Sequence, residues 1–286
     1  MGLFSFNYSK PGPGVSKDAP KKKGIFLYFE LLGRKFFKLI QVSWLYCLTS
    51  IPYILAMFFF ITTFFGGYFQ QLLSAGADSG LFSSENVNII IFMINALLTM
   101  LFFVLWGSGP ASAGFAYVTR CFTREEHSWV LTDFFEKMKE NFKQSIILVV
   151  IDFVVLYILL NAIIQYWTLY LVKNQITWLL LLYFCILAFV IYTLMHYIIY
   201  QVMVTYDCKF RNLLKNSLLI AIGKLPINLV LTIIPVAILY VLFNYLQPIP
   251  AVIIVLVILF GFLRYPLEFY AARTIQRILN ESTEEQ

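Results

Sequence analysis

Charged residues are scarce in this sequence. Only 13% of its 286 residues are Asp, Glu, Lys or Arg, whereas soluble domains carry about 25%. Apolar residues make up 60% of the chain, and the mean hydropathy is +0.80. A soluble fold has no core large enough for so much apolar surface, so the composition excludes an ordinary soluble domain and indicates an all-α membrane protein.

Catalytic and metal-binding patterns are missing too. The sequence has no G-x-S-x-G, no HExxH and no phosphate-binding P-loop, and it has two histidines, His127 and His196. Its four cysteines include no CxxC pair. We therefore expect no enzyme activity, no catalytic residues, no cofactor, no metal site and no disulfide framework.

Six long apolar blocks are present. A helix needs roughly 20 residues to cross about 30 Å of hydrocarbon, and each block is long enough to cross once. The blocks lack the alternation of a barrel wall, so we predict six transmembrane helices. They lie at about 39–67, 88–119, 145–171, 176–204, 217–245 and 250–272.

The basic residues predict the orientation of these spans. All but one of the 21 Lys and Arg residues fall on one side of the six-span scheme, and Lys173 alone falls on the other. The positive-inside rule therefore places both termini and the two longer basic loops in the cytoplasm. The same distribution explains the net charge of +6 through topology, so we expect membrane lipid and no nucleic acid as a partner.

The segments outside the spans differ in character. Residues 1–24, rich in Pro, Gly and Lys, are predicted to be a disordered cytoplasmic tail, and residues 273–286 a second cytoplasmic tail. Residues 25–38 are predicted to form an amphipathic helix at the membrane interface before span one.

A second amphipathic helix is expected at about 131–145, between spans two and three. Helical spacing puts Phe134, Phe135, Met138 and Phe142 on one face and charged residues on the other. We expect this helix on the inner membrane surface, where its apolar face is a candidate contact for another subunit.

A weak repeat precedes the odd-numbered spans, in RKFFKLI at 34–40, KENFKQS at 139–145 and RNLLKNS at 211–217. In each, two basic residues four apart precede an apolar span. The pattern is typical of three two-helix hairpins built by duplication. The positive-inside rule by itself also places paired basic residues there, so both explanations stand.

Asp152 and His196 are ionisable residues inside predicted spans. Asp152 lies near the cytoplasmic start of span three, and His196 near the cytoplasmic end of span four. These spans are antiparallel neighbours, so the two side chains should lie at similar depth and touch. Such a pair can relay protons or bind a cation, or it can be a structural hydrogen bond between packed helices.

Span two contains a small-residue stretch, WGSGPASAGFAYVTR at 106–120. Gly107, Gly109 and Gly114 favour close helix packing, and Pro110 removes a backbone hydrogen bond and predicts a kink. Broken helices of this kind line substrate paths in transporters, but close packing is the simpler explanation.

Three more polar residues are interpreted as structural. Arg264 and Glu268, four apart near the inner end of span six, predict a local ion pair at the interface. Gln201 in span four predicts a helix-to-helix hydrogen bond.

Four stretches together resemble the YesL-like family of bacterial integral membrane proteins, long filed as a domain of unknown function. They are FNYSKPGPGVSKDAPKKKG at 6–24, FELLGRKFFKLI at 29–40, GPASAGFAYVTR at 109–120 and TDFFEKMKENFKQS at 132–145. The resemblance implies a Gram-positive cytoplasmic membrane and genes beside those of carbohydrate ABC transporters. It implies no catalytic or ligand residues.

Three functions therefore stay open. The resemblance and the cytoplasmic helices favour an accessory or regulatory subunit associated with a carbohydrate ABC transporter and its permease subunits. Asp152, His196 and the broken span two favour a stand-alone small-molecule transporter or channel. The third is a structural or assembly factor. The oligomeric state is not predicted.

Overall fold

The computed structural model describes residues 24–52, 109–246, 250, 254 and 260–284. Every regular element of this described part is an α-helix, which confirms the all-α class. The predicted tail 1–24 lies almost entirely outside the described residues. Of the predicted spans at 39–67, 88–119 and 250–272, only 39–52, 109–119 and mainly 260–272 are described.

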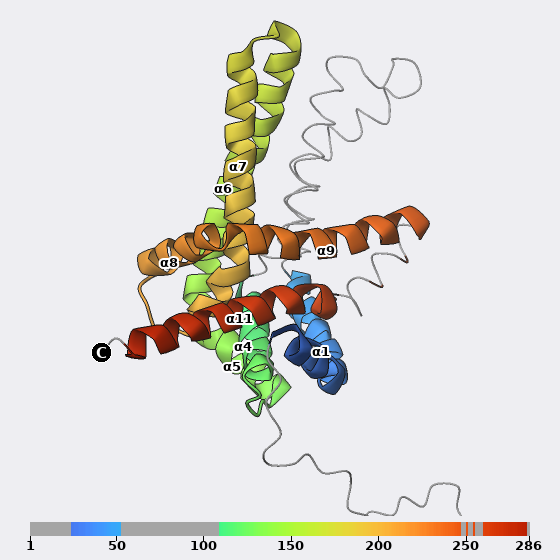
Figure 1. The fold of residues 1–286 in the computed structure, drawn as a ribbon, viewed down its shortest axis with the longest axis vertical. Helices are drawn as coiled ribbons and strands as arrows, with labels where there is room; N and C mark the ends of the chain where they lie inside the picture. Colours follow the sequence, from blue (N-terminus) through green and yellow to red (C-terminus); the bar gives the residue numbers. More distant parts are fainter. Residues whose placement is uncertain (1–23, 53–108, 247–249, 251–253, 255–259, 285–286) are drawn as a thin grey trace, which may run out of the picture.

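Helices α6 (Phe142–Lys173) and α7 (Ile176–Met203) form a long antiparallel hairpin. Asn174 sits between them in the left-handed region at φ 48°, the conformation that commonly ends a helix and that Asn tolerates. Figure 1 shows this α6–α7 hairpin projecting from the rest of the molecule. The two helices cover the predicted spans 145–171 and 176–204.

The predicted span 217–245 is divided. Helix α8 (Phe210–Gly223) ends at Lys224, and α9 (Leu225–Tyr245) begins directly after it. Pro226 stands in the first turn of α9, where its missing N–H costs nothing, although the same residue cannot continue α8. The prediction of a single helix over 217–245 is therefore wrong. Helices α8 and α9 lie across the base of the hairpin (Figure 1).

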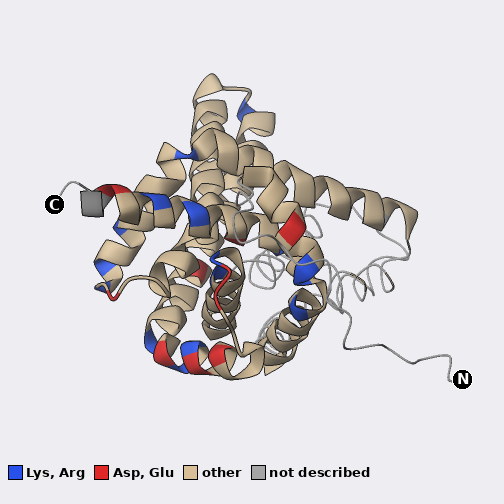
Figure 2. Cartoon of the chain, turned by 60° about the horizontal axis from the view of Figure 1, so that its bottom comes forward, with Lys and Arg blue, Asp and Glu red and all other residues tan. Residues whose placement is uncertain are grey.

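Within the described part of the chain, three helices are long and apolar enough to cross a membrane. They are Phe142–Lys173, Ile176–Met203 and Leu225–Leu242 of α9. This finding supports association with a membrane. Charged residues are sparse over most of the ribbon in Figure 2. The six-span count and the sides of the termini stay predictions.

The terminal helices are bounded differently from the predicted segments. Helix α1 (Gly24–Arg34) is shorter than the predicted 25–38, and after a turn at Lys35 residues 36–52 are helical. Helix α11 (Phe260–Glu284) continues twelve residues past the predicted end of span six at 272. The segment predicted as a C-terminal tail is thus mostly helical, because polar residues end a hydropathy peak without ending a helix.

Helices α4 (Pro110–Thr123) and α5 (Val130–Glu140) complete the base. The predicted amphipathic helix at 131–145 stops at Glu140, since Asn141 leaves the helical conformation and Phe142 opens α6.

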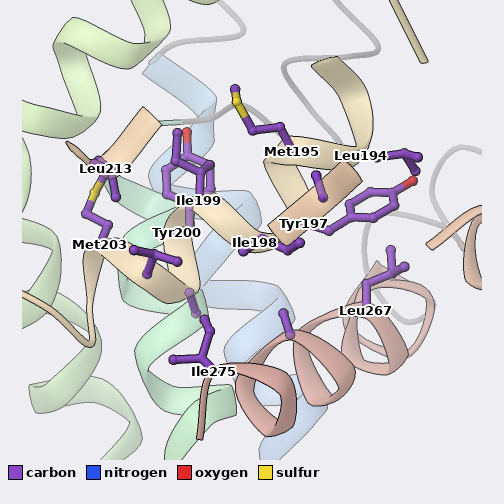
Figure 3. Packing of buried hydrophobic residues seen from close by; sticks show 14 of the residues in the cluster. Leu194, Met195, Tyr197, Ile198, Ile199, Tyr200, Met203, Leu213, Leu267 and Ile275 are labelled. Carbon is purple, nitrogen blue, oxygen red and sulfur yellow. The ribbon is translucent and has the colours of Figure 1, made fainter. Parts of the chain in front are cut away.

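The largest buried cluster surrounds the C-terminal half of α7. Figure 3 shows the α7 side chains from Leu194 to Met203 between Leu213 of α8 and the α11 residues Leu267 and Ile275. The base of the hairpin is therefore the core of the described molecule, and His196 and Gln201 of α7 are buried inside it.

Candidate functional site

The structure brings Asp152 and His196 together. Asp152 lies on α6 and His196 on α7, and the His196 Nε2 atom is 2.9 Å from Asp152 Oδ1. Both side chains are buried. Their contact follows from the antiparallel hairpin, which places residues equally far from its turn side by side.

Tyr192 is a third member of this group, and the sequence reasoning missed it. Its hydroxyl donates to Asp152 Oδ1 at 2.5 Å. One helical turn separates Tyr192 from His196, so both point toward α6 from the same face of α7. Tyrosines are common in the apolar spans of this chain, so Tyr192 does not stand out by residue type. Its position four residues before His196, on the same helical face, was the one signal that could have identified it.

The hydrogen bonds determine how the histidine holds its protons. His196 Nδ1 lies 2.9 Å from the backbone oxygen of Tyr192, and a carbonyl only accepts, so Nδ1 carries a hydrogen. The contact between Nε2 and Asp152 Oδ1 then contains one further proton, which belongs to the imidazole or to the carboxyl. The pair as a whole is neutral in both arrangements.

The second carboxylate oxygen of Asp152 has different surroundings. Among the described residues Oδ2 finds no hydrogen-bond partner, although it is buried. An unsatisfied buried acceptor costs about 1–3 kcal/mol, so a proton or a ligand donor at Oδ2 would relieve that cost. In the same described part no three His, Cys, Asp or Glu residues gather in a metal-binding group.

A second buried pair, Arg264 and Glu268, joins three helices near the first. Arg264 Nε donates to Glu268 Oε1 at 2.8 Å within α11, and Gln201 Nε2 of α7 donates to Glu268 Oε2 at 2.5 Å. Gln201 also donates to the Ala116 backbone oxygen at 2.9 Å, and Arg264 Nη1 lies 3.3 Å from Ser112 Oγ, both on α4. The predicted ion pair between Arg264 and Glu268 is confirmed, and both side chains are buried inside the helix base.

Aromatic rings enclose the Arg264 guanidinium. Its Cζ lies 4.8 Å from the ring centre of Phe115, 5.3 Å from that of Tyr46 and 6.0 Å from that of Tyr200. Cation–π contacts of this kind stabilise a desolvated cation. Tyr200 is one turn beyond His196 on α7, so the two buried pairs adjoin along that helix.

In the small-residue stretch, the described structure begins at Gly109, directly before α4. The φ of Gly109, 60°, is in the region that favours glycine, and Pro110 then opens α4 as its first residue. A Cβ at Gly109 would lie 2.8 Å from Val149 Cγ2, so α4 also meets α6 closely there. Gly107 lies outside the described residues.

Gly114 lets α5 approach α4. A Cβ at this position would lie 2.7 Å from the Phe134 backbone oxygen, closer than real Cβ contacts. Close packing is thus what the structure shows for Gly114.

The four residues predicted as a partner contact are divided by the fold. Phe134 is fully buried against α4, and Phe135 and Met138 pack at the edge of the same cluster. Of the four, Phe142 alone is exposed, at 51%, and it belongs to α6. Most of this apolar face therefore contacts the chain's own helices.

Arg120 and Asp133 form hydrogen bonds at helix ends. Arg120 of α4 donates from Nη1 to the Val204 backbone oxygen at 2.6 Å, where α7 ends, and to Thr205 Oγ1 at 3.1 Å. Burial lowers the pKa of Arg120 from its ordinary value, and the neighbouring Arg124 charge lowers it further. Asp133 accepts from Ser128 Oγ and from the Trp129 N–H at the start of α5.

One part of the chain matches a family of known proteins. Residues 90–163 match the model of a family described as a protein of unknown function, DUF624. The DUF624 match is consistent with the YesL-like resemblance and covers less than half of the chain. It contains Gly109, Arg120, Asp133 and Asp152, and it ends before His196. No curated protein and no solved structure matches this chain.

Proposed function

We propose that this protein is an accessory or regulatory subunit of a carbohydrate ABC-type uptake transporter in the bacterial cytoplasmic membrane, with both termini in the cytoplasm. The carbohydrate class comes from the YesL-like resemblance. The structural observation that carries the role as a subunit is the exposed surface of the α6–α7 hairpin.

The most apolar part of each hairpin helix is largely exposed within the described part of the chain. In the most apolar 18-residue windows of α6 and α7, 22% and 17% of the residues are buried within the described molecule. The outward side chains are large and include aromatic ones, a composition found in contacts between subunits. Lipid or neighbouring helices must cover this surface, and permease helices are the partner that an accessory subunit requires.

The buried charges support the same proposal. Asp152 is paired with His196, and Arg264 with Glu268. The first pair joins α6 to α7, and the second, within α11, is hydrogen-bonded to α7 and α4, as expected for a core that positions helices rather than one that opens a path for a solute.

Site-specific photo-crosslinking in the native host tests the proposal. A photoreactive amino acid at Phe184, 69% exposed on α7, should crosslink to permease subunits identified by mass spectrometry. The matched control is Leu182 on the same helix, which is 4% exposed and should give no crosslink to another protein. A mild-detergent pull-down of the tagged chain should recover the same subunits in stoichiometric amounts.

Two outcomes of these experiments would contradict the accessory role. If the pull-down recovers the chain alone and Phe184 gives no protein crosslink, the accessory role is wrong. If it instead recovers unrelated membrane proteins in small amounts, the chain is better described as an assembly factor.

The unpartnered Oδ2 atom of Asp152 favours a second candidate, a stand-alone transporter that moves protons with its solute. A buried carboxyl that shares a proton with an imidazole can gain or lose one as the helices move. The purified protein in liposomes should then take up a solute in response to a pH gradient, and Asp152→Asn should abolish that uptake. Asp207→Asn, the same change on an exposed loop, is the control.

A further inference from the structure

A cleft separate from the buried pairs lies between α1, α9 and α11. Its volume is about 850 Å³. Most of its walls are apolar side chains, and they come from all three helices: Phe29 from α1, Ile227, Leu231 and Ile234 from α9, and Pro266 and Phe269 from α11. An apolar cleft of this size needs an occupant when the chain is in its membrane.

One end of the cleft is basic. Lys224 stands at the junction of α8 and α9, and Arg273 and Arg277 lie one turn apart on α11. All three are exposed, and Glu281 is the one acidic residue of the lining. Figure 2 shows Lys and Arg along the helix that leads to the C-terminus. No ion pair joins these three residues to a carboxylate within the described part of the chain.

The apolar part is about as long as an acyl chain that reaches through one lipid leaflet. From Lys224 the wall follows α9 through Ile227 and Leu231 to Ile234, ten residues on, which is about 15 Å at 1.5 Å per residue. Half of a hydrocarbon core about 30 Å thick is the same length. The basic end and the apolar wall of the cleft therefore match the headgroup and one acyl chain of a single anionic phospholipid.

We propose that this cleft binds a single anionic phospholipid from the inner leaflet. Its phosphate lies against Lys224, Arg273 and Arg277, and one acyl chain follows the α9 wall. The predicted orientation puts these basic residues on the cytoplasmic side, where anionic lipids are held by Lys and Arg. The proposal depends on the membrane location of the chain and not on its role as a transporter subunit.

Native mass spectrometry of the full chain in detergent tests it. Phosphatidylglycerol and phosphatidylcholine with identical acyl chains are added in equal amounts, and the bound ratio is measured. The wild type should favour phosphatidylglycerol, and the double variant Arg273→Gln with Arg277→Gln should lose that preference by on the order of tenfold.

The matched control is Arg211→Gln with Lys215→Gln. These residues are also an exposed basic pair four apart, on α8 and outside the cleft. The control should keep the wild-type preference. Equal loss in both double variants would mean unspecific attraction by net charge and would overturn the proposal. Displacement of the lipid by millimolar inorganic phosphate would overturn it in favour of a soluble phosphate ligand.

Leu231→Trp tests the acyl part without changing any charge. The larger side chain should fill the α9 wall and reduce phosphatidylglycerol binding, with the protein still eluting as a single species. Wild-type binding by this variant would contradict the proposed position of the acyl chain. This variant also decides the matter if the arginine double variant does not fold.

Discussion

Asp152–His196 and Arg264–Glu268 are both buried, yet their carboxylates have different surroundings. Each oxygen of Glu268 accepts a hydrogen bond, one from Arg264 and one from Gln201. In Asp152 a single oxygen meets both the His196 ring and the Tyr192 hydroxyl, and Oδ2 has no partner among the described residues.

The basic partners of the two carboxylates, Arg264 and His196, differ in whether they can lose their proton. A guanidinium keeps its charge under all ordinary conditions, so Glu268 must stay ionised to balance Arg264. An imidazole can release its proton, so Asp152 and His196 can be neutral together. The first pair is suited to holding helices in place and the second to changing its protonation. Four substitutions test that difference, from the largest expected effect to the smallest.

Glu268→Gln should be the most destabilising of them. It leaves the Arg264 charge buried without a counter-charge, and we expect the free energy of unfolding to fall by about 3–5 kcal/mol. Chemical unfolding of the purified protein in mixed micelles measures this change in the free energy of unfolding. Glu140→Gln removes the exposed partner of Lys137 and should cost less than about 1 kcal/mol. Equal losses in the two variants would show that burial of the Arg264 pair has no consequence.

Gly114→Ala tests the packing that surrounds Arg264. The added Cβ would lie 2.7 Å from the Phe134 backbone oxygen and push α5 from α4, which carries Ser112 and Phe115. We expect a loss of about 1–3 kcal/mol in the same unfolding measurement. Gly33→Ala on α1, where a Cβ meets no atom within 4 Å, is the control and should be neutral or slightly stabilising. A neutral Gly114→Ala would contradict the close contact.

Tyr192→Phe removes the hydroxyl that donates to Asp152. We expect the free energy of unfolding to fall by about 1–2 kcal/mol, the range for a buried hydrogen bond to a carboxyl group. Tyr183→Phe, at an exposed position on the same helix, should leave unfolding unchanged. If the two variants behave alike, the Tyr192 hydroxyl contributes nothing to the Asp152 pair.

Asp152→Asn should have the smallest effect on stability, within about 1 kcal/mol. The amide keeps the size of the carboxyl and leaves no buried charge, because His196 can be neutral beside it. The measurement that matters is the difference in the free energy of unfolding between Asp152→Asn and Glu268→Gln, determined under the same conditions. A loss as large as that of Glu268→Gln would mean that Asp152 and His196 are a permanent ion pair, and the contrast between the two pairs would disappear.

Prediction from the sequence succeeded where a property is local. The α6–α7 hairpin follows from two apolar runs and a short polar turn, and the hairpin then places Asp152 beside His196. It failed at Lys224, because hydropathy stays high on both sides of the break between α8 and α9. It failed again beyond residue 272, where hydropathy falls while α11 continues to Glu284.

The sequence by itself determined the helical class, the membrane character and the pairing of Asp152 with His196, since each depends on residues close along the chain or on two neighbouring antiparallel helices. Only the tertiary structure decided that Arg264 and Glu268 are buried, and that α1, α9 and α11 enclose an apolar cleft with a basic end. Those features need side chains from three or more helices far apart in sequence. The angles at which such helices cross depend on packing between their surfaces, which no local pattern records.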